Sequence, residues 1–100
     1  MQTPLSFNDK NILNVPQTPG AFLLGCDKKI VFIGRAEKNL QSELRKYLPD
    51  SEKFDIVERF NPNHFWYICT RSSDDAYHLE LNLKVIYRPS INFLHEVEKE

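Results

Sequence analysis

The sequence predicts a single α+β domain over residues 1–100, built on a three-stranded or four-stranded antiparallel sheet flanked by helices. Two observations carry this prediction. Apolar runs at 20–26 and 30–34, rich in β-branched and aromatic residues, are joined by a short polar connection, which is typical of a β-hairpin. Downstream, apolar residues recur at helical spacing in two stretches, 37–48 and 74–87. No repeat or linker-like tract suggests a second domain.

One short helix is predicted before the hairpin. Ser6 is a suitable N-cap, and Asp9 falls in the first turn, where the helix dipole favours negative charge. Pro16 and Pro19 cannot continue a helix, so the chain should enter the hairpin in an extended conformation. Gly34 is expected to close the hairpin, because the next helical pattern begins soon after it.

The remaining elements are predicted from apolar stripes and boundary residues. The first long helix has the stripe Leu40, Leu44, Tyr47 and Leu48, with Pro49 as a stop. The second has capping hydroxyls at Ser72 and Ser73 and the stripe Ala76, Leu79, Leu83, Ile86 and Tyr87. Between them, we expect a strand over 64–70 and, over 54–60, an edge strand or an extended approach to it. The tail at 90–94 is apolar enough to pack on the domain, and 95–100 should be solvated.

Composition and charge restrict the function classes. A net charge of −1 argues against a general nucleic-acid coat protein. No run approaches the roughly 18 apolar residues of a membrane span, and the first residues lack the parts of a signal peptide. We therefore expect a cytoplasmic protein with no membrane partner. Residues 28–46 carry a local charge of +4, which fits either a phosphate-facing patch or a solvated helix face.

Several segments, in order, resemble the GIY-YIG nuclease family. Gly20-Ala21-Phe22 and Phe32-Ile33-Gly34 are similar to the two halves of the family signature. The segment 34–40 resembles the opening of the family's first helix, and 75–83 and 87–92 resemble its closing segments. The resemblance covers about residues 15–92 and implies a GIY-YIG endonuclease-like fold.

In active members, this resemblance implies hydrolysis of a DNA phosphodiester with one divalent metal, Mg²⁺ or Mn²⁺, held by a helix glutamate. A signature tyrosine helps to activate water, and an arginine on the first helix stabilises the phosphate charge. Glu80 falls at the position of the metal ligand and lies beside the buried helix stripe. The alternative interpretation of Glu80 is an ion pair with Lys84, one turn later.

Three positions depart from the family pattern. Phe22 and Phe32 stand where the family has its tyrosines, and phenylalanine has no hydroxyl to accept or orient a proton. Glu43 stands at the arginine position, where a carboxylate repels phosphate. Arg35, from the loop, and Arg45, from the helix, are the candidate substitutes, although Arg45 lies about 200° around the helix from Glu43.

The sequence therefore leaves two principal hypotheses and a third. The first is a catalytically impaired module that binds DNA or RNA, or another protein. Its nucleic-acid contacts would be Lys28, Lys29, Arg35, Lys38 and Lys46. The second is an active metal-dependent DNA endonuclease with a site remodelled around Glu80. The third is a protein-interaction module that never meets nucleic acid, which predicts an exposed apolar patch.

Overall fold

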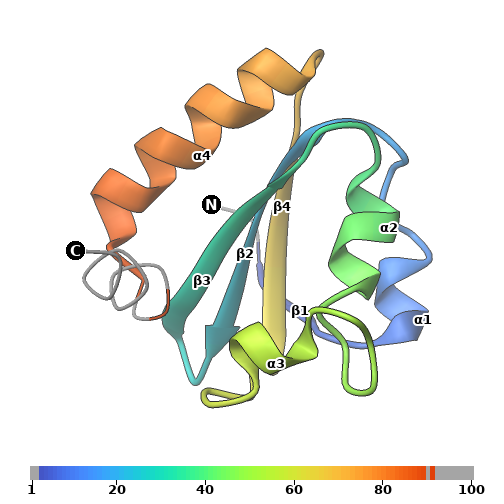
Figure 1. Ribbon diagram of the computed structural model, residues 1–100, viewed down its shortest axis with the longest axis vertical. Helices are drawn as coiled ribbons and strands as arrows, with labels where there is room; N and C mark the ends of the chain where they lie inside the picture. Colours follow the sequence, from blue (N-terminus) through green and yellow to red (C-terminus); the bar gives the residue numbers. More distant parts are fainter. Residues whose placement is uncertain (1–2, 90, 92–100) are drawn as a thin grey trace.

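The computed structural model describes residues 3–89 and residue 91. Its elements are β1 (Leu5–Ser6), α1 (Asp9–Ile12), β2 (Gly20–Cys26), β3 (Lys29–Ala36), α2 (Leu40–Arg45), α3 (Phe54–Val57), β4 (His64–Cys69) and α4 (Ser73–Tyr87). The four strands form one antiparallel sheet in the order β1-β4-β2-β3. Helices α1 and α2 lie on one side of the sheet and α4 on the other (Figure 1). The predicted α+β class is confirmed.

The hairpin of β2 and β3 is joined by a two-residue turn. Asp27 and Lys28 both have positive φ, 50° and 72°, as a tight turn matching the right-handed twist of the strands requires. Strand β3 runs past Gly34 and ends at Ala36, two residues beyond its predicted end. This extension carries Arg35 within the strand instead of in a loop.

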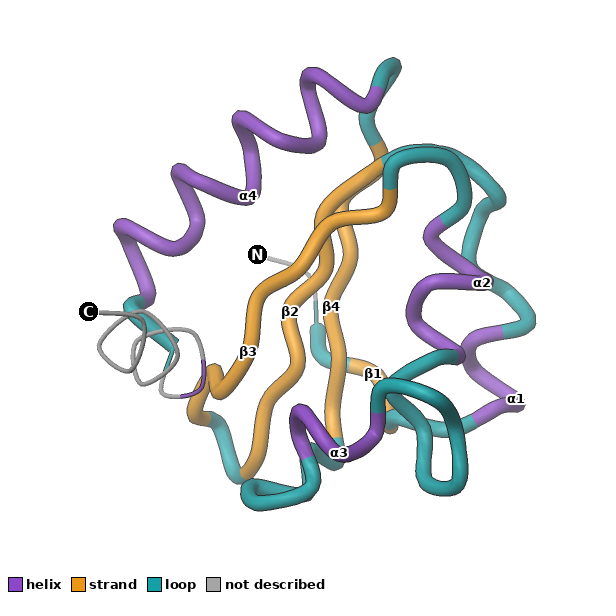
Figure 2. Tube along the Cα trace, in the orientation of Figure 1, coloured by secondary structure: helices purple, strands orange, loops and turns teal. Residues whose placement is uncertain are grey.

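The sheet separates two apolar cores. The larger core lies on the side of α1 and α2 and includes Phe22, Phe32 and Tyr47. The smaller core lies under α4 and includes Ile33 and Leu83. Strand β3 thus has an aromatic side and an α4 side, and Figure 2 shows it at the edge of the sheet between the helices.

Two predictions about strands are wrong in detail. Residues 54–57 form helix α3 instead of an edge strand. The fourth strand comes from the N-terminus, where Leu5 pairs with Phe65 and Ser6 with His64. A two-residue strand is too short for any alternation of apolar and polar residues to predict it.

Helix boundaries also shift. Asn8, not Ser6, caps α1 by accepting a hydrogen bond from the Asn11 amide. Helix α2 starts only after Asn39, which caps it, so residues 37 and 38 precede the helix. Helix α4 begins after the predicted cap, Ser72, and ends at Tyr87 as predicted. The predicted tail at 90–94 lies outside the described residues except for Ile91, which packs on the larger core, and 95–100 lie outside them entirely. Within the described residues, no helix has the length and hydrophobicity that crossing a bilayer requires.

Candidate functional site

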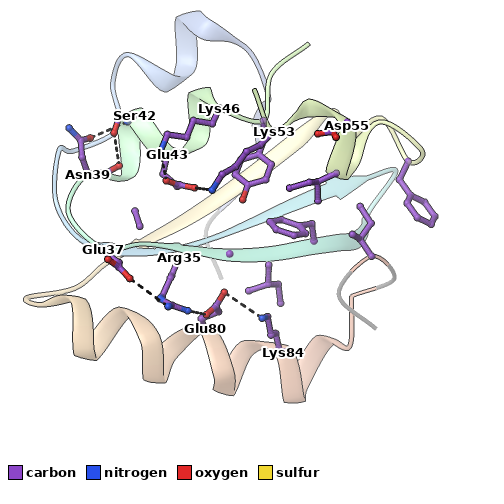
Figure 3. A pocket seen from close by; sticks show the side chains of 18 of the residues that line it. Arg35, Glu37, Asn39, Ser42, Glu43, Lys46, Lys53, Asp55, Glu80 and Lys84 are labelled. Atoms are coloured by element: carbon purple, nitrogen blue, oxygen red, sulfur yellow. Dashed lines mark hydrogen bonds and ion pairs between the residues drawn. The ribbon is translucent and has the colours of Figure 1, made fainter. Parts of the chain in front are cut away.

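A cleft of about 930 Å³ lies along edge strand β3, between α2 and α4 (Figure 3). Its basic lining residues are Arg35, Lys38, Lys46, Lys53, Arg59 and Lys84, and its acidic ones are Glu37, Glu43, Asp55 and Glu80. Basic side chains are therefore in excess among the described lining residues, although the whole chain has a charge of −1. The cleft is a focus of positive charge on a nearly neutral protein.

Glu80 is the most deeply placed carboxylate of the cleft. It shares the buried face of α4 with Ala76 and Leu83, and the residue is 6% exposed. Its Oε1 accepts a hydrogen bond of 2.7 Å from Arg35 Nη1, and its Oε2 lies 3.5 Å from Lys84 Nζ. Both the buried placement and the Lys84 pair agree with the sequence-based interpretations, whereas the closer partner, Arg35, was not expected.

The Arg35 guanidinium is held from several directions. The hydrogen bond to Glu80 raises the pKa of Arg35, against the lowering effect of burial. Glu37 lies 3.6 Å from the same guanidinium, and the Tyr77 ring lies 5.0 Å from its central carbon. Arg35 thus reaches the cleft, which is required of any residue that replaces the family's arginine. Its nearest partner there is Glu80.

Glu80 offers a divalent cation one carboxylate, although both of its oxygens face cationic side chains in the described structure. Mg²⁺ commonly keeps several waters and takes one or two carboxylates together with substrate phosphates. The Oε1 atom is occupied by Arg35, but Oε2 faces Lys84 at 3.5 Å, longer than an ordinary N–H···O hydrogen bond. Glu80 Oε2 is therefore the atom that would ligate a cation, in competition with Lys84. No group of three or more His, Cys, Asp or Glu among the described residues forms a closed metal cage.

Glu43 lies on the opposite side of β3 from Glu80 (Figure 3). Its side chain is 16% exposed and holds two ammonium groups, Lys46 Nζ at 3.2 Å and Lys53 Nζ at 2.9 Å. Glu43 therefore places a negative charge in the cleft, as the sequence predicts, but the positive charges of the two lysines exceed it. Sequence reasoning did not single out Lys53, because the loop at 50–53 carried no predicted structure.

The two signature phenylalanines pack with a tyrosine. Phe22 is fully buried and Phe32 is 9% exposed. The Tyr47 ring centroid lies 5.4 Å from that of Phe22 and 5.1 Å from that of Phe32. Burial, and secondarily the charges of Glu43 and Glu80, raise the pKa of Tyr47 above its usual value of 10.0. The sequence assigned Tyr47 to a buried stripe only, yet its position one turn after Glu43 could have indicated a hydroxyl in the cleft.

The other basic candidates are divided between two places. Lys38 and Lys46 line the cleft. Lys28 and Lys29 lie at the hairpin turn, and the rise of a strand places Lys29 about 20 Å from Arg35. Arg45 does not line the cleft: its Nε lies 3.4 Å from Asp9 Oδ1, on the side of α1. The five predicted nucleic-acid contacts therefore do not form one compact patch.

Sequence comparison finds relatives that are named UvrABC system protein C, although no protein-family model matches. The chain is 36% identical over 88 residues to the UvrABC system protein C of Aquifex aeolicus, and 34% identical over 85 residues to that of Methanosphaera stadtmanae. These alignments cover 85% and 78% of this chain. The chain spans only 15% and 14% of the length of these relatives.

Comparison with solved structures also finds UvrC proteins. The GIY-YIG N-terminal endonuclease domain of UvrC from Thermotoga maritima, bound to magnesium as its catalytic divalent cation, matches with a TM-score of 0.68 and 32% identity. The match covers 82% of this chain and 91% of that domain. The chain belongs to the GIY-YIG nuclease family, as the motifs suggested. Within that family, it is related to the N-terminal endonuclease domain of UvrC.

Three further structures of the Thermotoga domain each carry one tyrosine-to-phenylalanine replacement, and each is bound to the catalytic divalent cation. This chain is 34% identical to two of these variants and 31% identical to the third, against 32% for the magnesium-bound domain. These identities differ from one another by at most three percentage points.

Proposed function

We propose that this chain is a nucleic-acid-binding domain of the GIY-YIG fold in which phosphodiester hydrolysis is impaired. The observation that carries the proposal is the pair of phenylalanines, Phe22 and Phe32, packed against Tyr47 where the resemblance implies catalytic hydroxyls. A phenyl ring can neither accept a proton from water nor orient the water for attack.

The charges of the cleft support binding. Phosphate contacts supply most of the sequence-independent affinity of proteins for nucleic acids. Six basic side chains line the cleft, and the carboxylates of Glu43 and Glu80 are each placed between two of them. A phosphodiester that approaches Glu43 or Glu80 thus meets ammonium and guanidinium groups before it meets those two carboxylates.

An active metal-dependent nuclease is the second candidate, and Glu80 is the observation that favours it. Glu80 would hold Mg²⁺, which would neutralise the charge that develops on the phosphate. Tyr47 would supply a phenol hydroxyl beside the two phenylalanines. Its pKa is raised further above neutrality by burial, so the phenol is a poor acceptor for the proton of water at neutral pH.

A protein partner is favoured by a different surface. Helix α4 exposes an apolar strip on its outer face, with Leu81 at 41%, Val85 at 75% and Ile86 at 70% exposure. Such a strip is the feature that the protein-interaction hypothesis predicts. It lies on α4 outside the described lining of the cleft, so nucleic-acid and protein binding are compatible.

Cleavage assays test the proposal. Purified protein should bind DNA but leave supercoiled, single-stranded and branched DNA uncut with Mg²⁺ or Mn²⁺. The double variant Phe32→Tyr/Glu43→Arg restores one hydroxyl and the arginine, and we expect it to gain metal-dependent cutting of at least 10-fold over background. Robust cutting by the unmodified chain, lost in Glu80→Ala and kept in the control Glu58→Ala, an exposed glutamate outside the described lining of the cleft, would replace the proposal with the nuclease alternative.

A further inference from the structure

We propose that Lys46 and Lys53, held in place by Glu43, form a phosphate-binding site that requires no metal ion. The inference rests on the proposed nucleic-acid binding and names one backbone phosphate as the ligand of this part of the cleft. Figure 3 shows Glu43, Lys46 and Lys53 together on the α2 side of β3.

The geometry gives each carboxylate oxygen of Glu43 one ammonium group. Lys46 Nζ lies 3.2 Å from Oε1, and Lys53 Nζ lies 2.9 Å from Oε2. The cluster therefore has a net charge of +1, the same charge that a single arginine at position 43 would have. The carboxylate side chain is 16% exposed and both lysine side chains are 38% exposed, so an anion entering from solvent meets the ammonium groups first.

The two lysines come from separate segments that the backbone joins. Lys46 follows the last turn of α2, and Lys53 directly precedes α3. The Lys53 amide donates a hydrogen bond of 2.9 Å to the Lys46 carbonyl, which fixes the two segments side by side. The Lys53 ammonium also lies 5.6 Å from the centre of the Tyr47 ring. Both side chains are thus ordered before a ligand binds, which lowers the entropy cost of binding.

Phosphate suits this arrangement chemically. Each ammonium has three N–H donors and uses one on Glu43, so two donors on each lysine remain for an anion with several acceptor oxygens. Lysine binds phosphate as a point charge without demanding the planar geometry of a guanidinium. On the α4 side of β3, by contrast, Arg35 is bound at 2.7 Å to the deeper carboxylate Glu80 and is less available to a ligand.

Anisotropy measurements with a fluorescein-labelled 20-base-pair DNA duplex in EDTA, over a series of salt concentrations, test the inference. Lys46→Gln/Lys53→Gln should weaken binding by about 10-fold or more and reduce the slope of log affinity against log salt by about one, the value for one phosphate. The comparison variant Lys28→Gln/Lys29→Gln removes the same charge at the hairpin turn and should change affinity by less than about 3-fold. Equal losses in the two variants, or a larger loss at the hairpin, would overturn the phosphate site.

A second measurement avoids variants that fold poorly. Inorganic pyrophosphate, titrated in EDTA into ¹⁵N-labelled unmodified protein, should shift the amide signals of Lys46, Tyr47 and Lys53 more than those of Lys28 and Lys29. Shifts confined to other residues would overturn the site. If pyrophosphate binds at this cluster but the DNA duplex does not bind, the site stands and the proposed nucleic-acid function fails. If DNA binds equally well to both double variants and pyrophosphate leaves the cluster unshifted, the function stands and the site fails.

Discussion

Strand β3 separates two carboxylates that the protein holds in different ways. On the α4 side, the Glu80 side chain is 8% exposed and binds the planar guanidinium of Arg35 at 2.7 Å. On the α2 side, Glu43 is 16% exposed and holds two lysines that are each 38% exposed. A buried charge depends strongly on its partner, whereas a shallower charge with solvent-exposed partners can share them with water or a ligand. The Glu80 pair on the α4 side therefore contributes mainly to stability, and the Glu43 cluster on the α2 side is suited mainly to ligand binding.

The largest effect should follow removal of the guanidinium on the α4 side. Arg35→Met leaves Glu80 buried with Lys84 alone at 3.5 Å, and we expect the free energy of unfolding to fall by about 2–3 kcal/mol. Urea denaturation measures the loss. The control Arg59→Met changes an exposed arginine of the same cleft and should cost less than about 0.5 kcal/mol. A similar loss in both variants would remove the distinction between the two sides of β3.

A smaller effect should follow crowding of the aromatic side. A Cβ atom at Gly34 would lie 2.6 Å from Phe22 Cζ and 3.0 Å from Phe32 Cε2, and both rings are confined by the core. We expect Gly34→Ala to reduce the free energy of unfolding by about 1–2 kcal/mol. The shorter side chain in Gly34→Ala/Phe22→Leu should relieve the contact, so the double variant should be more stable than the sum of the single losses predicts. Strict additivity would show that ring packing does not limit this position.

The smallest effect concerns the Tyr47 hydroxyl and appears only at high pH. Its folded-state pKa is raised above 10.0, so the folded protein keeps a proton that the unfolded chain loses. Below about pH 10, ionisation of Tyr47 therefore does not lower the free energy of unfolding. Above pH 10 the free energy of unfolding falls as the pH rises, by about 1 kcal/mol at pH 11. In Tyr47→Phe, urea midpoints at pH 9 and pH 11 should differ by less than in the unmodified protein. Equal differences would mean that Tyr47 titrates normally.

The sequence predicts the fold well where local signals agree. The apolar runs of β2 and β3 flank turn residues, and α4 has a cap and buries Ala76 and Leu83 of its predicted stripe. The prediction is wrong for Ile86 and Tyr87 at the end of that stripe, which are exposed. Residues 54–60 misled the prediction because Phe54, Ile56, Val57 and Phe60 fit strand and helix spacing about equally, and Lys53 gives no side-chain cap. Helix α3 is thus decided by packing of Val57 into the core, which sequence spacing does not reveal.

The sequence predicts contacts of the candidate site only where both residues lie on the same helix. Helical spacing alone places Glu80 on the buried face of α4 and beside Lys84. The contact of Arg35 with Glu80 joins residues 45 positions apart, and that of Lys53 with Glu43 joins a loop to a helix. Such contacts depend on how the elements pack, so these two partners of the carboxylates could not be read from the sequence.

The location of the cleft on an edge strand has a consequence for self-association. Strand β3 ends the sheet, and an exposed edge is a template on which a strand from another copy can add and start aggregation. Charged side chains on such a strand disfavour this addition, and β3 carries Lys29 and Arg35 at its two ends. The guanidinium that binds Glu80 therefore also helps to keep individual molecules apart in concentrated solution.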